Sequence, residues 1–99
     1  MRGNKTAMER LIKVLDMKMP VNIVGESDYI EGNKNEIRVI VKEKPESVII
    51  FVIESSPERT EHVVENVLND HNSQYKKKES KGQMRLKYVV ESVDENTFA

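Results

Sequence analysis

The stretch that decides the fold is SVIIFVIE, Ser47–Glu54, in which every residue from Val48 to Ile53 is apolar. A strand with one face in water alternates between apolar and polar residues, whereas an unbroken apolar run is typical of a strand with apolar neighbours on both faces. The run stands out because 33 % of the 99 residues are charged. The run predicts a strand with apolar neighbours on both faces. Whatever contacts its second face is relevant to function.

Turn signals bound the strands before this run. Residues 44–47, KPES, place proline at the second position of a tight turn, which separates the apolar strand from a strand over residues 36–44. A further turn is expected at Gly32 and Asn33, which tolerate positive φ. An earlier strand over residues 21–30 precedes that turn, so the three strands are expected to form a meander.

Capping signals bound two helices. Thr6 and Glu9 have the spacing of a capping box, which predicts the start of a first helix, and Pro20 ends that helix because it has no amide donor. Ser56 as N-cap before Pro57 at the first helical position predicts the start of a second helix after the apolar strand.

A last strand is expected over residues 84–93, where apolar and polar residues alternate, and a short extra strand near residues 75–78 is left open. The order is α-β-β-β-α-β, an α+β fold with an antiparallel sheet of four to five strands and both helices on one face. Residues 1–93 are expected to form one compact domain. Residues 94–99 are expected to form a flexible C-terminal tail.

The composition excludes several classes of protein. The chain has no cysteine, which excludes a disulfide scaffold and thiolate metal sites, and its net charge of −1 gives no overall attraction to nucleic acid or membranes. No apolar run approaches the roughly 20 residues that a membrane span needs. The N-terminal sequence has no apolar signal segment. We therefore expect a cytoplasmic protein without cofactor or membrane partner.

The second face of the apolar strand is the first candidate site. Val48, Ile50 and Val52 share one face of this strand, and Ile49, Phe51 and Ile53 share the other, but the sequence leaves open which face meets the helices. The C-terminal strand or hairpin could fold over part of the second face, or the apolar strand could be central in the sheet and slightly exposed. Alternatively, an apolar patch on that face could bind a protein partner or a second copy of the chain. For a partner we expect contact through residues of two neighbouring strands, Ile40, Phe51 and Ile53.

A basic segment near the C-terminus is the second candidate site. Its side chains could hold an acidic protein surface, or they could bind nucleic acid if the flanking tyrosines stack on bases. The acidic second helix lies at the opposite pole, and such charge separation helps to orient a protein partner. The residues of this segment are Tyr75, Lys76, Lys77, Lys78, Lys81, Arg85, Lys87 and Tyr88.

No pattern of catalytic residues or metal ligands emerges, so we expect a non-enzyme. Paired carboxylates such as Glu26 and Asp28 are typical of a solvated surface in a chain this charged. His62 and His71 lack the i, i+4 spacing of helical metal ligands. His71 is expected instead to interact with carbonyl groups at the end of the second helix.

Two families of nucleic-acid proteins share the order of elements. The order resembles the core of restriction-endonuclease-like nucleases, which need an Asp/Glu-x-Lys motif on the third strand, but here Ser56 stands where that lysine would be. Residues 6–71 also look like a double-stranded RNA-binding domain. That family contacts phosphates with lysines at the start of its second helix, where this chain has the acidic Glu58 and Glu61.

The layout from Met8 to about His71 is similar to that of small phage-encoded inhibitors, including anti-CRISPR proteins. The likeness is carried by the amphipathic first helix, ERLIKVL, by two short turns and by the apolar third strand. It implies a viral protein that binds and inhibits a host protein. Our first hypothesis is accordingly a small interaction protein with a host partner; the alternatives are a nucleic-acid-binding module and a structural homodimer.

Overall fold

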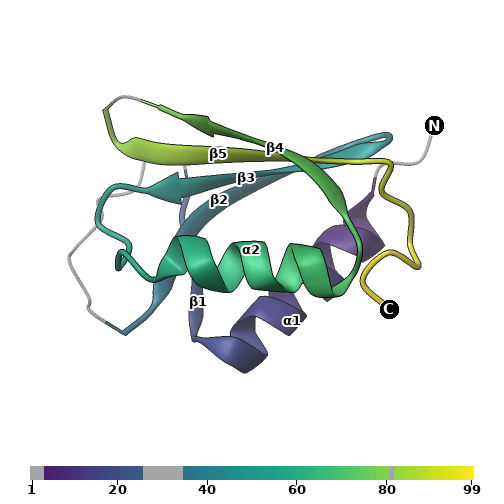
Figure 1. Ribbon diagram of the computed structural model, residues 1–99, viewed down its shortest axis with the longest axis horizontal. Coiled ribbons are helices and arrows are strands. Elements are labelled where there is room, and N and C mark those ends of the chain that lie inside the picture. The colour runs from purple at the N-terminus through teal and green to yellow at the C-terminus, as the bar shows by residue number, and fades with distance from the viewer. Residues whose placement is uncertain (1–3, 26–34, 81) are drawn as a thin grey trace.

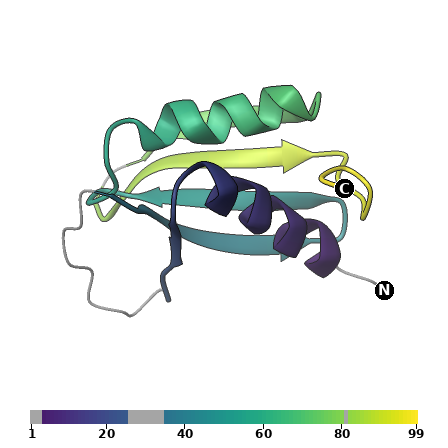
Figure 2. The same cartoon turned by 90° about the horizontal axis from the view of Figure 1, so that it is seen from below.

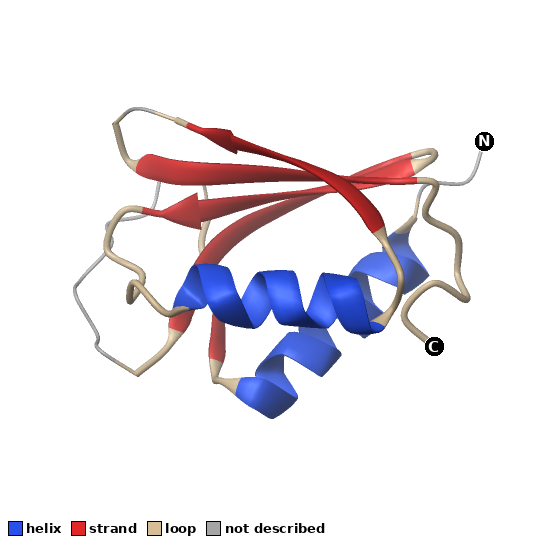
Figure 3. Cartoon of the chain, in the orientation of Figure 1, coloured by secondary structure: helices blue, strands red, loops and turns tan. Residues whose placement is uncertain are grey.

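The computed structural model describes residues 4–25, 35–80 and 82–99 of the chain. Over these residues the chain has two helices and a five-stranded sheet, which confirms the α+β class (Figure 1). The short extra strand is present and forms a hairpin with the last strand. The elements, coloured by type in Figure 3, are α1 (Lys5–Lys18), β1 (Val21–Ile23), β2 (Ile37–Lys44), β3 (Ser47–Ile53), α2 (Thr60–Asp70), β4 (Gln74–Glu79) and β5 (Met84–Glu91).

The strand order in the sheet is β1-β2-β3-β5-β4, so the apolar strand β3 lies at the centre. The pairs β2–β3, β3–β5 and β4–β5 are antiparallel, as expected. The pair β1–β2 is parallel, with Val21 opposite Ile37, so the prediction of a wholly antiparallel sheet is wrong at this edge. A parallel pair requires a crossover of a dozen or more residues, and residues 24–36 are long enough to provide it.

Some predictions for this connection fall on residues without a described structure. The expected turn at Gly32 and Asn33 lies outside the described residues, as does the part of the expected first strand from residue 26 to residue 30. The described strand β1 ends at Ile23.

One face of β3 lies in the main core. Val48, Ile50 and Val52 are completely buried, and both helices lie on this side of the sheet (Figures 1 and 2). These side chains belong to one cluster with Leu11 and Leu15 of α1. Full burial of one such aliphatic side chain contributes about 1.5–3 kcal/mol to folding. This packing decides which face of β3 meets the helices, a choice that the sequence left open.

The other face of β3 is covered only in part. At the C-terminal end of β3, Ile53 is buried in a smaller cluster with Val24 and Ile40, while Phe51 and Met84 are partly buried against this cluster. The hairpin of β4 and β5 extends the sheet sideways and does not fold over this face, so that alternative is wrong. The alternative of a central, slightly exposed third strand is confirmed.

The N-terminus of α1 is held by contacts distant in sequence. The side-chain amide of Asn4 donates hydrogen bonds to the carbonyl oxygens of Lys44 (2.9 Å) and Pro45 (3.1 Å) in the turn between β2 and β3. No side chain caps the helix, so the capping box predicted at Thr6 is wrong. The helix is anchored to the sheet through a tertiary contact instead of a local one.

The start of α2 differs from the prediction for a similar reason. The helix begins at Thr60, and the hydroxyl of Ser56 acts in the sheet instead of capping the helix. Its Oγ accepts a hydrogen bond from the backbone N–H of Arg38 (2.8 Å) and donates one to the Arg38 carbonyl (2.7 Å). The Ser56 hydroxyl, which the local sequence predicts as the cap of α2, is thus hydrogen-bonded to the backbone of β2.

The C-terminal segment packs against the core, and the expectation of a flexible tail from residue 94 is corrected accordingly. Phe98 is only 2 % exposed, and its ring meets His71 edge to face with the centroids 5.4 Å apart. Arg10 of α1 donates a hydrogen bond to the carbonyl of Glu95. A buried aromatic ring and a hydrogen bond to α1 thus attach the segment to the rest of the domain.

We predict that Phe98→Ala lowers the free energy of unfolding by about 3 kcal/mol, because removing a buried aromatic ring loses its transfer energy and leaves a cavity. Urea denaturation followed by circular dichroism measures the change. Glu95→Ala is the control, since this side chain is exposed in the same segment. Equal stability of the two variants would show that the segment does not contribute to the core.

Candidate functional site

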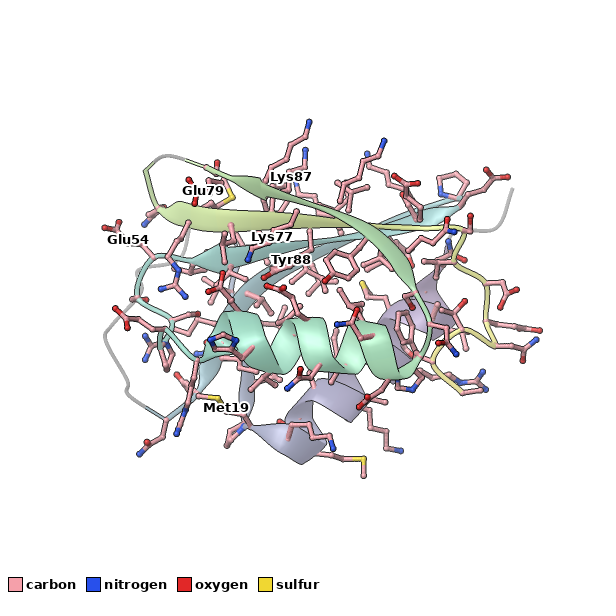
Figure 4. The ribbon with its side chains drawn as sticks, in the orientation of Figure 1. Met19, Glu54, Lys77, Glu79, Lys87 and Tyr88 are labelled. Atoms are coloured by element: carbon pink, nitrogen blue, oxygen red, sulfur yellow. The ribbon has the colours of Figure 1, made fainter. Side chains whose placement is uncertain are left out.

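The candidate site is the face of the sheet that points away from both helices. Strand register places alternate residues of four strands on this side, and Figure 4 shows Lys87 directed away from the helices. We call it the open face and define it by Lys42 of β2, Ile49 and Phe51 of β3, Lys76 and Lys78 of β4, and Lys87, Val89 and Glu91 of β5.

Phe51 lies at the centre of the open face. It is half-buried, and two ammonium groups lie over its ring: Lys87 Nζ at 5.7 Å and Lys42 Nζ at 5.9 Å from the ring centroid. A cation this close to an aromatic ring is attracted by the electrons of the ring face. Ile49 and Val89, which are opposite each other in the ladder, add apolar surface beside the ring. The centre of the face is therefore apolar, with cations directly around it.

Two lysines face each other across the hairpin. Lys78 of β4 is directly opposite Lys87 of β5 on the open face. Like charges in directly opposed positions destabilise a strand pair, by up to about 1 kcal/mol. Within the described residues neither lysine has an ion pair, whereas Lys76 pairs with Glu91 Oε1 at 3.3 Å. An acidic residue in place of either lysine would replace this repulsion with an attraction and stabilise the hairpin.

Lys77 lies on the opposite side of the sheet and is already engaged. Its ammonium group meets Glu61 Oε2 at 2.7 Å and Glu65 Oε2 at 2.8 Å, both on α2. The hydroxyl of the fully buried Tyr88 donates to the same Glu65 oxygen at 2.8 Å. Figure 4 shows Lys77 and Tyr88 between the hairpin and α2. Lys77 and Tyr88, both predicted as contact residues, instead attach the helix to the sheet.

This network shifts the pKa values of its members. Burial by itself would raise the pKa of Glu65, but hydrogen bonds from Lys77 and Tyr88 outweigh burial and lower that pKa below its ordinary value. The hydrogen bonds to Glu61 and Glu65 raise the pKa of Lys77. Burial, with the hydrogen bond to Glu65, raises the pKa of Tyr88. All three groups therefore keep one protonation state around neutral pH.

Arg85 and Tyr75 also have structural contacts. The Arg85 guanidinium donates to the carbonyl oxygens of Ser56 (2.8 Å) and Pro57 (3.1 Å), which holds the connection between β3 and α2. The Tyr75 ring is partly buried against the main core and lies 5.8 Å from the Tyr88 ring. Lys81, also predicted as a contact residue, lies outside the described residues.

The predicted contact residues that the structure describes thus separate into three groups. The first group has the structural contacts given above: Lys77, Tyr88, Arg85 and Tyr75. Phe51, Lys76, Lys78 and Lys87 come together on the open face. Ile40 and Ile53 are on the same side of the sheet but are largely buried, at 8 % and 2 % exposure, and offer little surface to a partner.

The sequence-based prediction omitted four members of the open face: Lys42, Ile49, Val89 and Glu91. The alternation of residues along each strand would have assigned them to one face, but only after the inner face of β3 was known. The run from Val48 to Ile53 is apolar on both faces, so the sequence could not supply that starting point.

Several titratable side chains line a groove beside α2. His62 lines a groove with Glu58 and Glu61 of the α2 region, and Arg59 and Arg85 line the same groove with the opposite charge. No group of three or more His, Asp or Glu residues among the described residues could hold a metal ion. His71 Nδ1 donates to the Val67 carbonyl at 2.9 Å, as expected for the end of the helix. No helix described in the chain is long and apolar enough to cross a membrane.

Comparisons with known proteins do not assign the chain to a family. No family model matches it, and neither a curated protein nor a solved structure is significantly similar to it. The geometry of the open face is therefore the basis for any functional inference.

We predict that Tyr88→Phe lowers the free energy of unfolding by about 1.5 kcal/mol at pH 7, because a partly buried hydrogen bond to a charged carboxylate is lost. The lowered pKa of Glu65 stabilises the fold above the ordinary carboxyl pKa of about 4.3. That contribution disappears as the pH falls through the lower pKa of the folded protein. The stability difference between the two proteins should therefore shrink below about pH 4.

Urea denaturation at pH 7 and at several values down to pH 3 measures this difference. The matched control is Tyr75→Phe, which removes a hydroxyl from the neighbouring ring. This variant keeps the hydrogen bond from Tyr88 to Glu65. A difference between Tyr88→Phe and the parent protein that stays constant with pH would contradict the assigned role of Glu65.

Proposed function

We propose that this protein is a non-enzymatic interaction protein whose open face binds an acidic surface of a partner protein. The observation that carries the proposal is the repulsive pair Lys78–Lys87 beside the half-buried Phe51. An acidic side chain of a partner placed between the two ammonium groups would relieve the repulsion and add two ion pairs. The repulsion would thus lower the stability of the free protein, and binding of the partner would restore the lost free energy.

The distribution of apolar and charged groups supports a protein partner. The open face has Ile49, Phe51 and Val89 near its centre and lysines around them. Protein interfaces commonly combine an apolar, desolvated centre with a polar rim, and an aromatic anchor often contributes most of the affinity. The lysines would orient the partner and accelerate association.

Nucleic acid is the less favoured partner. Binding of single strands relies on several aromatic side chains that stack on successive bases. Tyr88 is fully buried and Tyr75 is turned to the core, which leaves Phe51 as the aromatic residue of the open face as defined. The acidic residues of α2 also bring the net charge of the whole chain to −1.

A homodimer through the open face is disfavoured by the same charges. Two copies in face-to-face contact would place four lysines and one glutamate of each copy against the same set. Like charges across an interface oppose association. We extend the proposal to a host protein as the partner, whose activity binding would block.

We predict that Lys78→Glu separates folding from binding. A glutamate opposite Lys87 replaces a repulsive pair with an attractive one, so the free energy of unfolding should rise by up to about 1 kcal/mol. Affinity for an acidic partner should fall about fivefold, because an exposed ion pair contributes up to about 1 kcal/mol. Fluorescence anisotropy measures binding of a labelled, terminally blocked octapeptide in which glutamate and valine alternate, at low and moderate salt.

The control is Lys13→Glu on the exposed surface of α1, which changes the net charge by the same amount on the other side of the molecule. This variant should bind the peptide like the parent protein. A labelled thymidine dodecamer is titrated in parallel. Binding of the oligonucleotide and not of the peptide would overturn the proposal in favour of a nucleic-acid partner, and binding of neither would also overturn it.

A further inference from the structure

Strand β4 forms one edge of the sheet, and its hydrogen-bonding pattern follows from one contact. The backbone N–H of Ser80 donates to the carbonyl of Arg85 at 3.0 Å, so this pair is hydrogen-bonded. Hydrogen-bonded and non-hydrogen-bonded pairs alternate along an antiparallel ladder. The register from Gln74 to Glu79 then directs the backbone groups of Gln74, Lys76 and Lys78 toward β5.

The intervening residues of β4 direct their backbone groups outward. The N–H and C=O groups of Tyr75, Lys77 and Glu79 point to the free edge, where the described chain offers them no backbone partner. A row of unpaired backbone groups on an edge strand is a template for an added strand. The six residues of β4 are long enough to pair with such a strand along their full length.

The charges of β4 select the sequence of the added strand. The exposed Lys76 and Lys78 project onto the open face next to this edge. Acidic side chains at alternate positions of an added strand would lie beside them, and opposite charges on neighbouring strands are favourable. A second copy of β4 is a poor partner, because antiparallel pairing of β4 with itself about Lys77 places Lys76 against Lys78.

We propose that an extended, acidic segment of the partner protein adds to β4 as a sixth strand. This inference rests on the proposed function and specifies the mode of binding. The added strand would use the three outward N–H and C=O pairs for affinity. Its acidic residues on the open face would contact Lys76 and Lys78, while its edge toward solvent would remain free for the rest of the partner.

Amide hydrogen exchange measured by NMR tests the added strand. In the free protein the amides of Tyr75, Lys77 and Glu79 should exchange rapidly, whereas those of Lys76 and Lys78 are protected by β5. With the alternating glutamate and valine octapeptide at saturation, exchange of the three outward amides should slow by about tenfold or more. Protection of the inward amides should change little in comparison.

A pair of variants tests the same contact by affinity. Glu79→Pro removes one outward N–H and is compatible with an edge strand, because the hydrogen bonds to β5 stay intact. Compared with Glu79→Ala, it should weaken peptide binding about fivefold, since one backbone hydrogen bond contributes roughly 1 kcal/mol. Circular dichroism verifies that both variants fold, and the exchange measurement gives a result even if Glu79→Pro does not.

The two proposals fail in different ways. Peptide binding that depends on Lys78 without protection of the three outward amides would overturn the added strand and leave the open face as the binding surface. Absence of peptide binding altogether would overturn both the proposed function and the added strand. Protection of the outward amides by a control peptide with lysine in place of glutamate would overturn the selection for an acidic segment.

Discussion

Val48, Ile50 and Val52 of β3 are withdrawn completely from water on the side of the sheet where both helices lie. Because β3 is the central strand, β2 and β5 must align with it, and β4 follows β5 outward. The helices cover one face only. Ile53 is buried in the smaller cluster with Ile40, while the Phe51 ring lies between Lys42 and Lys87. The packing of one strand thus produces both the core and the open face.

The alternation of side chains along β4 divides one run of three lysines between two environments. Lys77 turns toward α2 and joins Glu61 and Glu65, so it holds helix and sheet together. Lys76 and Lys78 point to the other side. Lys77 thereby partly neutralises the acidic charge of α2, and the other two lysines of the run add basic charge to the open face. The separation of charge in the molecule therefore results from the alternation of side chains along β4 more than from the overall composition.

At the hairpin, the proposed binding and the stability of the free protein have opposite requirements. A glutamate at the position of Lys78 would favour the folded chain, because it would face Lys87. The repulsion that remains in the free protein is the kind of local conflict that functional surfaces often contain. The proposed acidic partner would resolve this conflict from outside, and an added strand on β4 would place its acidic residues where the charges are unbalanced.

The sequence by itself determined the α+β class, the order of the main elements and the antiparallel pairing of β2 with β3, because these follow from local periodicity and turn residues. It left the hairpin of β4 and β5 open, and it did not predict the pairing of β3 with β5. Tertiary structure decided what depends on long-range contacts. Ser56 and Asn4 bond to distant backbone groups, Phe98 returns to the core, and the long connection to β2 permits a parallel pair at the edge. The apolar run of β3 has the same character on both faces, so only the packed helices could assign one face to the core. That assignment turned Tyr88 inward and brought Lys78 and Lys87 together on the open face.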